Sequence, residues 1–298
     1  MKKVSLFICS IFLIQSCTSQ KIENEIPFRL TKYNNIIVST VINDKDSTQL
    51  MLHTGSDYIS LIERSLPKFK TLQINDTIKG VTSWAGYSDQ GISINNVVQL
   101  GKNNFNKIPI FIDQQSGHES DGKIGMKFFK DQYLEINFDT NKLIVYKETP
   151  RHLKNFESIE SRYENETLLF KGFPLLDNKL IETEFMLHTG YSGAIIFSDQ
   201  YVKNNLLLEK FKPTGETKFS DAAGNQIISK KSILPEFKFG KSMLTNLPIS
   251  YFDSEVKIQH VNIFGGDLIK RFNWILSPDL KTIYFKPNKN FNEEYFKL

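Results

Sequence analysis

Met51-Leu52-His53-Thr54-Gly55 recurs 135 residues later as Met186-Leu187-His188-Thr189-Gly190, and this repeated pentapeptide decides how the rest of the chain is interpreted. In each copy an apolar run leads directly into His-Thr-Gly. An apolar run that stops at a small polar residue and a glycine predicts a buried strand followed by a tight turn. Two copies within a chain of 298 residues indicate that the sequence around them is duplicated.

Other landmarks recur in the same order at nearly the same spacing. Each pair lies 139 or 140 residues apart: Gly101 and Gly240, Lys102 and Lys241, Pro109 and Pro248, Gly125 and Gly265, Asp139 and Asp279. A repeat of this length indicates two copies of one lobe, because solenoids and propellers repeat every ~20–50 residues. The polar stretch from Glu148 to Glu166 is the predicted linker between the copies.

Most of the chain is predicted to form short β-strands. Residues 36–42 are an apolar, β-branched run, and a turn cluster separates them from a second run at 49–52. Residues 133–139 and 142–146 flank Thr140-Asn141, which indicates a hairpin. The chain also contains 24 phenylalanines, and aromatic residues favour the half-buried surface of a sheet. The fold class is therefore mostly β.

Short helices are expected after each repeated pentapeptide. Ser198 is a suitable N-cap for a helix that runs to Leu208, and residues 59–66, ended by Pro67, are its expected counterpart in the first half. Single helical turns are expected within 125–130 and 266–272, each before the final hairpin of its half.

The first 17 residues have the pattern of a bacterial lipoprotein signal. Lys2 and Lys3 precede a short apolar run over 4–13, and Ile14-Gln15-Ser16-Cys17 resembles the motif in which the cysteine is acylated. An ordinary signal peptide with an incidental cysteine is the alternative. We expect residues 18–26 to form a tether and Cys17 to carry lipid, which anchors the protein to the outer membrane on its periplasmic face or at the cell surface.

Composition excludes other classes of function. The net charge is only +4, and lysines and arginines do not cluster with aromatic residues, so no nucleic-acid partner is expected. Cys17 is the only cysteine that remains after signal removal, which excludes an internal disulfide framework. The membrane partner is expected to be reached through the lipid alone, and the sequence predicts no oligomeric state.

Together, these segments resemble the pepsin/retropepsin superfamily of aspartic proteases in its bilobal form. Each lobe of that family has an apolar strand, an Asp-Thr/Ser-Gly loop, a flap hairpin and an apolar-Gly segment, which here are 123–125 and 263–265. Lys123 departs from the apolar pattern. The resemblance implies a mostly β, two-lobed, pepsin/retropepsin-like β-barrel fold with short helices, internally duplicated, with lobes at 27–150 and 151–298.

The same resemblance assigns roles to the repeated pentapeptide. His53 and His188 occupy the positions of the catalytic aspartates, which in this family share one proton and together activate a water molecule. Thr54 and Thr189 are expected to lock the two loops, while Gly55 and Gly190 permit the tight turn. Because both carboxylates are replaced, the usual chemistry of the family is in question.

Four interpretations of the two histidines remain open. The chain is a pseudoprotease that binds a peptide or protein in the cleft without cleaving it, or a hydrolase in which one imidazole is a base and the other an acid. A metal bridging His53 and His188 is a third option, although a catalytic zinc site normally has three protein ligands. The fourth is aspartic proteolysis through carboxylates placed elsewhere. We expect no cofactor, and we favour the pseudoprotease, with an active peptidase of the superfamily as the alternative.

Two flap hairpins are the remaining candidates for ligand contacts. The first lies at 79–87, where Ser83, Trp84 and Tyr87 are expected to cover the ligand. The second lies at 218–225 and contributes Asp221. Aromatic side chains in such a loop bury an extended peptide that pairs like a strand.

Overall fold

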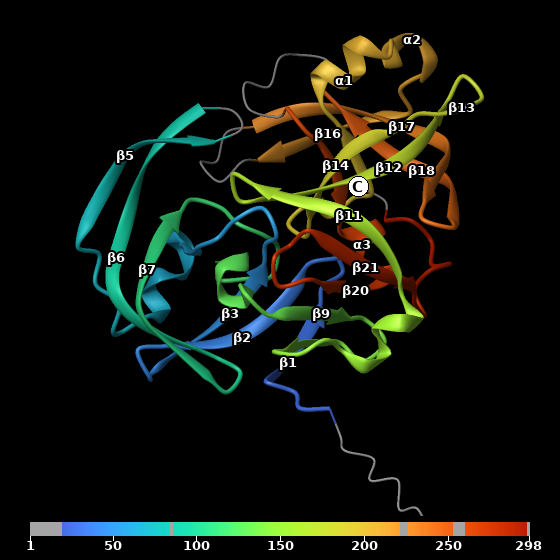
Figure 1. Cartoon of the computed structure of the whole chain (residues 1–298). Helices are drawn as coiled ribbons and strands as arrows, with labels where there is room; N and C mark the ends of the chain where they lie inside the picture. The colour runs from blue at the N-terminus through green and yellow to red at the C-terminus, as the bar shows by residue number, and fades with distance from the viewer. Residues whose placement is uncertain (1–19, 84–85, 221–225, 253–259, 297–298) are drawn as a thin grey trace, which may run out of the picture.

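The computed structural model describes residues 20–83, 86–220, 226–252 and 260–296, and these form two lobes built almost entirely of β-strands (Figure 1). The signal and Cys17, expected within residues 1–17, lie outside the described residues. None of the helices formed by the described residues has the length and apolar character needed to cross a membrane.

The first lobe is one sheet of strands that meet behind the first pentapeptide. Strand β3 ends just before His53 and runs parallel to β8, while β4 runs parallel to β7 and antiparallel to β8. The strands of this lobe are β2 Ile36–Ile42, β3 Asp46–Leu52, β4 Ile59–Ile62, β5 Asp76–Ser83, β6 Gly86–Leu100, β7 Asn103–Asp113 and β8 Gly122–Ile124.

The second lobe repeats this arrangement around the second pentapeptide. Strand β14 runs parallel to β19, while β15 runs parallel to β18 and antiparallel to β19. Its strands are β12 Thr167–Leu176, β13 Lys179–Leu180, β14 Thr183–His188, β15 Ile195–Phe197, β16 Gly215–Ser220, β17 Gln226–Phe239, β18 Ser242–Tyr251 and β19 Asn262–Gly265. The duplication expected from the sequence is therefore present in the strand pairing.

A third set of strands joins the lobes. Three strands come from each half and pair in the order β1–β10–β9–β20–β21–β11, with Trp274 of β20 opposite Ile136 of β9. Their bounds are β1 Asn24–Leu30, β9 Tyr133–Asn137, β10 Lys142–Tyr146, β11 Glu157–Glu164, β20 Phe272–Leu276 and β21 Thr282–Pro287. The apolar core runs through both lobes and this sheet, because Leu134, Phe239 and Trp274 belong to one buried cluster.

The helices are short, and two predictions about them are wrong. The helix expected to run from the Ser198 cap to Leu208 is interrupted between Asn204 and Leu207. The expected helix at 59–66 is instead strand β4 followed by the 3-10 helix η1 Glu63–Lys68, which contains Pro67. All four residues of β4 are buried between β7 and β8, so pairing in the sheet overrides the apolar spacing. The other helices are η2 Met126–Phe129, η3 Arg151–Asn155, α1 Asp199–Asn204, α2 Leu207–Lys210 and α3 Gly266–Ile269.

Two expected loops also contain regular structure. The tether predicted over 18–26 ends early, because β1 begins at Asn24. The polar linker predicted from Glu148 to Glu166 contains η3 and the strand β11, whose side chains alternate between partly buried and exposed positions. Only Ile159 and Tyr163 are apolar or aromatic in β11, which is too few for a clear apolar strand pattern.

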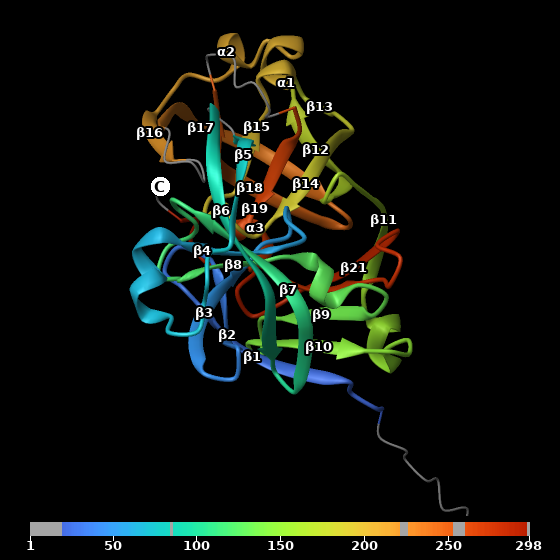
Figure 2. The ribbon, with the colours of Figure 1, turned by 90° about the vertical axis from the view of Figure 1, so that its left-hand side faces the viewer.

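The long hairpin formed by β5 and β6 stands apart from the body of the first lobe. Figure 2 shows this hairpin rising from the first lobe in front of the boundary with the second, and Figure 1 shows β16 and β17 of the second lobe on the other side of that boundary. The two hairpins contain the described parts of the segments 79–87 and 218–225, where flaps were expected.

Candidate functional site

The two His-Thr-Gly loops are held in place by the strands beside them. The backbone N–H of His53 donates to the carbonyl of Ile124 at 2.9 Å, which extends the β3–β8 pairing by one residue. His188 is the last residue of β14 and is paired with Gly265 of β19. Each histidine therefore follows an apolar strand that is buried in its own lobe.

Thr54 and Thr189 tie the two loops together with four hydrogen bonds. The Thr54 hydroxyl donates to the carbonyl of Leu187 and the Thr189 hydroxyl to that of Leu52, both at 2.5 Å. Each hydroxyl also accepts from the backbone N–H of the other threonine at 3.1 Å. Both side chains are at most 1% exposed. The bonds cross the boundary between the lobes, so the loops form one rigid unit.

This unit brings the two imidazoles into contact. The ring centroids of His53 and His188 are 4.6 Å apart, and the planes are inclined by 72°, an edge-to-face arrangement. His188 is 7% exposed, whereas His53 retains partial exposure. The pair is therefore reached from solvent through His53.

The glycines of the two loops are needed for a reason that the sequence did not indicate. Neither Gly55 nor Gly190 has the left-handed backbone that favours glycine in a tight turn. A Cβ atom at Gly190 would lie 2.7 Å from Nε2 of His53 and 3.0 Å from Cε1 of His188, closer than packed atoms allow. At Gly55 it would lie 2.3 Å from the end of Met186. Gly190 therefore makes room for the two rings, and Gly55 makes room for the end of Met186.

The hydrogen bond of His53 to its own loop fixes which ring nitrogen carries the proton. The backbone N–H of Gly55 donates to Nδ1 of His53 at 3.2 Å. An imidazole nitrogen that accepts a hydrogen bond is unprotonated, so the neutral ring of His53 carries its proton on Nε2. Because the ring of His53 is partly exposed, its Nε2–H is a hydrogen-bond donor on the solvent-accessible side of the pair.

Both histidines are kept neutral. Burial is the main cause that lowers the pKa of His53 well below its usual value, and the neighbouring His188 and the ammonium group of Lys123 lower it further. Burial, with the charge of Lys123, lowers the pKa of His188 to about 4. At neutral pH the pair therefore has no net charge, whereas two carboxylates that share one proton carry a single negative charge.

The acidic residues near the loops are engaged in other contacts. Asp57 accepts a hydrogen bond from the hydroxyl of Tyr163 in β11, a strand of the second half. Asp121 accepts from Lys68 and from the backbone of Gln49, and these bonds outweigh its burial and lower its pKa. Asp267 pairs with Arg271 and Lys270. These contacts account for the three carboxylates as structural groups.

A buried polar cluster that no sequence motif predicted lies beside the first loop. Asp113, at the end of β7, forms an ion pair with Lys123 of β8 at 2.9 Å and accepts a hydrogen bond from Ser60 of β4 at 2.5 Å. Gln90 of β6 donates to the second carboxylate oxygen. The only signal in the sequence was the unexpected lysine at position 123, because the other three residues come from separate strands.

The predicted flap residues are described only in part. Ser83 ends β5, and Tyr87 lies near the start of β6 with 69% of its surface exposed. Trp84 and Asp221, the other predicted ligand contacts, lie outside the described residues. Tyr87 is therefore a flap side chain open to solvent.

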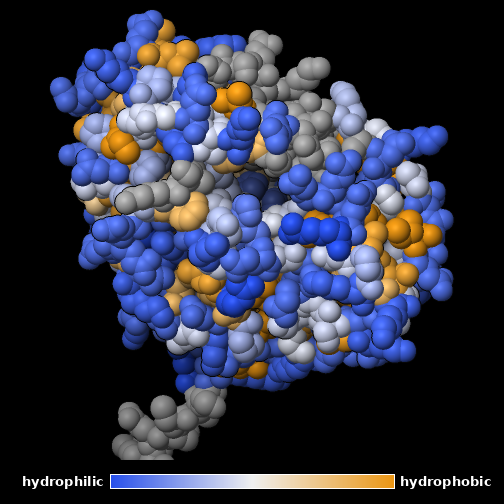
Figure 3. Space-filling view, turned by 180° about the vertical axis from the view of Figure 1, so that it is seen from behind, coloured by the Kyte–Doolittle hydropathy of each residue, from blue (hydrophilic) through white to orange (hydrophobic). Residues whose placement is uncertain are grey.

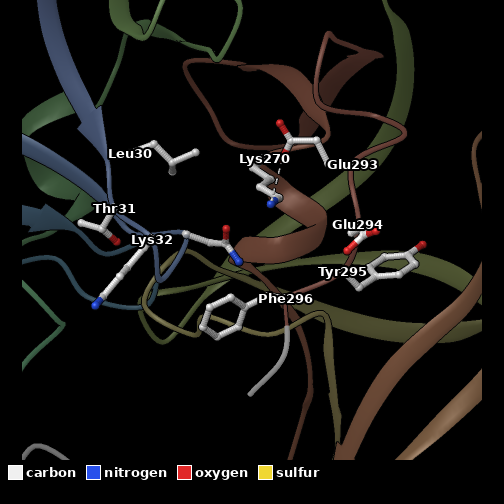
Figure 4. A pocket seen from close by; sticks show the side chains of 9 residues that line it. Leu30, Thr31, Lys32, Lys270, Glu293, Glu294, Tyr295 and Phe296 are labelled. Carbon is white, nitrogen blue, oxygen red and sulfur yellow. Dashed lines mark ion pairs between the residues drawn. The ribbon is translucent and has the colours of Figure 1, made fainter.

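A hollow lies near the C-terminal segment. It has a volume of about 520 Å³, and Figure 4 shows Lys32 from the first lobe on one side and Lys270, Glu293 and Phe296 on the other. Figure 3, which views the molecule from behind, shows a mainly hydrophilic face with a hollow near its middle. Neither histidine of the pair is among the residues that line the pocket.

Metal binding has little support from the geometry. Within the described part of the chain, no three histidine, cysteine, aspartate or glutamate residues are grouped as a metal site would require. His118 stacks on Tyr33 with ring centroids 4.0 Å apart, and His152 contacts Glu135 at 2.8 Å. Both side chains are thus occupied elsewhere.

Comparison with known proteins agrees with this architecture. No protein-family model and no curated sequence matches the chain. Among solved structures, the aspartic proteinase from Irpex lacteus is similar with a TM-score of 0.59 and 10% identity, over 90% of this chain and 98% of that chain. At this identity the likeness establishes the fold, which is the mostly β, two-lobed fold of pepsin-like aspartic proteinases.

Proposed function

We propose that this chain is a pseudoprotease that binds a peptide or a protein segment in the cleft between its lobes without cleaving it. One observation carries the proposal: the two loops that the sequence resemblance matches to the catalytic loops of aspartic proteases bring two neutral imidazoles into contact. Hydrolysis by such a pair needs one group that takes a proton from water and one that gives a proton to the peptide. At neutral pH neither ring is charged, so the acid is missing.

The rest of the loop architecture supports binding. The threonine hydrogen bonds hold the floor rigid, and each half of the chain contributes one flap hairpin. An extended peptide can add to a sheet by pairing with the edge of a strand. Among the described residues, β5 pairs with β6 and β16 pairs with β17, each along one edge, so the other edge of each strand is where a peptide would pair. These features of the loops and hairpins support binding of an extended chain.

A peptidase that uses the histidines is the second candidate, and one observation favours it. The pKa of His188, about 4, is close to that of an ordinary carboxylate. Near that pH one ring can be charged and the other neutral, which is the arrangement that acid–base catalysis needs. This candidate predicts activity only in acid.

Turnover on a diverse peptide library, from pH 3 to pH 8, separates the two candidates. The wild-type protein, His53→Ala and the double variant His53→Asp/His188→Asp are assayed side by side. We expect no cleavage by the wild type at any pH. Cleavage that disappears in His53→Ala contradicts the pseudoprotease, and addition of a chelator then distinguishes a metal site from catalysis by the histidines alone.

We also propose that Cys17 carries lipid and anchors the protein to the outer membrane. The motif that ends at Cys17 and the position of β1, which starts only at Asn24, support a short tether between lipid and fold. Growth with a tagged fatty acid is expected to label the wild type but not Cys17→Ser. Equal labelling of both contradicts this proposal.

A further inference from the structure

The polar cluster formed by Ser60, Gln90, Asp113 and Lys123 lies opposite the apolar core. Leu61, Ile112 and Ile124 alternate with cluster residues along β4, β7 and β8 and point into the core, where each is at most 7% exposed. Alternate residues of a strand face opposite sides of a sheet. The cluster therefore occupies the face of this sheet that the core does not cover.

Two contacts place the cluster between the floor of the cleft and the flap. Lys123 lies opposite Met51 in the register of β3 and β8 and precedes Ile124, whose carbonyl holds the backbone of His53. Gln90 belongs to β6, the long strand of the flap hairpin. The cluster thus forms a wall beside the histidines and below the flap.

Lys123 is the part of this wall that a ligand can reach. The side chain of Asp113 is 2% exposed, whereas that of Lys123 is 18% exposed. An ammonium group has three N–H donors, and Asp113 is the ion-pair partner that the described residues provide. The positive charge of Lys123 also contributes to the lowered pKa of both histidines.

The floor itself lacks the negative charge of a carboxylate pair. His53 presents an Nε2–H donor, and the two rings carry no charge at neutral pH. A negatively charged floor repels an anionic ligand, whereas a neutral floor with a donor and a nearby ammonium attracts one. The uncharged floor with its donor and the nearby ammonium group therefore both favour an anionic ligand.

We propose that Lys123 is the specificity-determining residue of the cleft and selects peptides that place a carboxylate beside His53. The carboxylate is an acidic side chain or the free C-terminus of the peptide. Lys123 binds it through the donors that Asp113 does not take, and Asp113 holds the lysine in position. This inference rests on the proposed peptide-binding function.

Lys123 and Asp113 offer two variants with opposite expected effects. Lys123→Met removes the cation, so the affinity for acidic peptides should fall roughly tenfold. Asp113→Asn keeps a hydrogen-bonding group for Ser60 and Gln90 but removes the competing carboxylate, so the same affinity should rise. A purely structural ion pair would lose binding in both. Lys130→Met, which removes an exposed lysine of the same lobe, is the matched control and should change nothing.

The full-length protein in detergent is titrated with a position-scanning library of acetylated, amidated nonapeptides in which each pool fixes glutamate or glutamine at one position. Fluorescence anisotropy reports binding at pH 7. A further set of glutamine peptides with a free C-terminus tests the second source of the carboxylate. If Lys123→Met does not fold, the double variant Asp113→Asn/Lys123→Met, which leaves no unpaired buried charge, takes its place.

The inference is supported if the wild type prefers glutamate pools or the free C-terminus, and if this preference is lost in Lys123→Met but kept in Lys130→Met. Which of the two is preferred identifies the source of the carboxylate. Peptide binding with no preference for a carboxylate, or with a preference that survives the loss of Lys123, overturns this inference alone. Absence of binding by every pool overturns the proposed function and the inference together.

Discussion

His188, 7% exposed, couples the stability of the fold to pH. Its pKa is about 4 in the folded protein against 6.5 for an ordinary histidine. Below pH 6.5 the unfolded chain binds a proton that the folded chain does not, so this residue makes the fold less stable as the pH falls from 6.5 to about 4. The expected loss is roughly 2 kcal/mol, measured by urea unfolding at pH 7 and pH 4.5.

His188→Gln is the control for this prediction, because glutamine does not titrate. Its free energy of unfolding should depend less on pH than that of the wild type over the same range. An unchanged dependence would mean that other groups are responsible.

The threonine hydroxyls offer a second prediction at the scale of single residues. Thr54→Val removes one hydroxyl and leaves the carbonyl of Leu187 and the N–H of Thr189 buried without their partner. We expect a loss of about 2–4 kcal/mol in the free energy of unfolding. Thr54→Ser keeps the hydroxyl and should lose far less, so equal losses in the two variants would argue against the hydrogen bonds as the cause.

At the scale of elements, the glycine segments behind the loops admit no side chain. A Cβ at Gly125 would lie 2.2 Å from the carbonyl oxygen of Ser56, and at Gly265 it would lie 2.3 Å from that of Gly193. Because both neighbours are backbone atoms, each alanine substitution must displace a loop. We expect losses of about 3 kcal/mol or more.

Gly215→Ala is the matched control for these substitutions. Gly215 lies in β16, where the nearest atom to an added Cβ is on the flexible Lys231 at 4.0 Å. Chemical denaturation should show a change of less than about 0.5 kcal/mol. A comparable loss at Gly215 would mean that alanine disturbs any strand of this fold.

Elements with a strong local signal could be predicted from the sequence, and others could not. The hairpin of β9 and β10 has a turn between two apolar runs, and the Ser198 side chain accepts a hydrogen bond from Tyr201 at the start of α1, as an N-cap does. Residues 59–62 are an apolar run that suits a helix or a buried strand equally. Only their pairing with β7 and β8, from distant parts of the chain, decides for a strand.

The candidate site could likewise be predicted where a local motif marked it, and not where residues from distant strands meet. The duplicated motif indicated that His53 and His188 belong to equivalent loops, but it carried no information about the tilt of their rings or the ring contacts of Gly190. The cluster around Asp113 was hidden because its members are far apart in the sequence and meet only through the parallel pairing of β4 with β7 and the flap strand.

For the whole molecule, the shared sheet predicts that the lobes unfold together. Three strands of one half pair side by side with three of the other at the β9–β20 junction, and the buried cluster continues across the boundary. Urea unfolding followed by tryptophan fluorescence and by far-UV circular dichroism should therefore give one coincident transition. Two separated transitions would show that each lobe is an independent folding unit.

The path of β1 has a mechanical consequence. Asn24 to Pro27 pair with β10 in the sheet shared by the lobes, and Phe28 to Leu30 pair with β2 of the first lobe. A tension applied at the N-terminal end and directed along the strand loads these bonds in shear, all at once rather than one after another. In a protein anchored by its N-terminal end, force therefore enters the fold through the sheet that joins the lobes, before it reaches either flap hairpin.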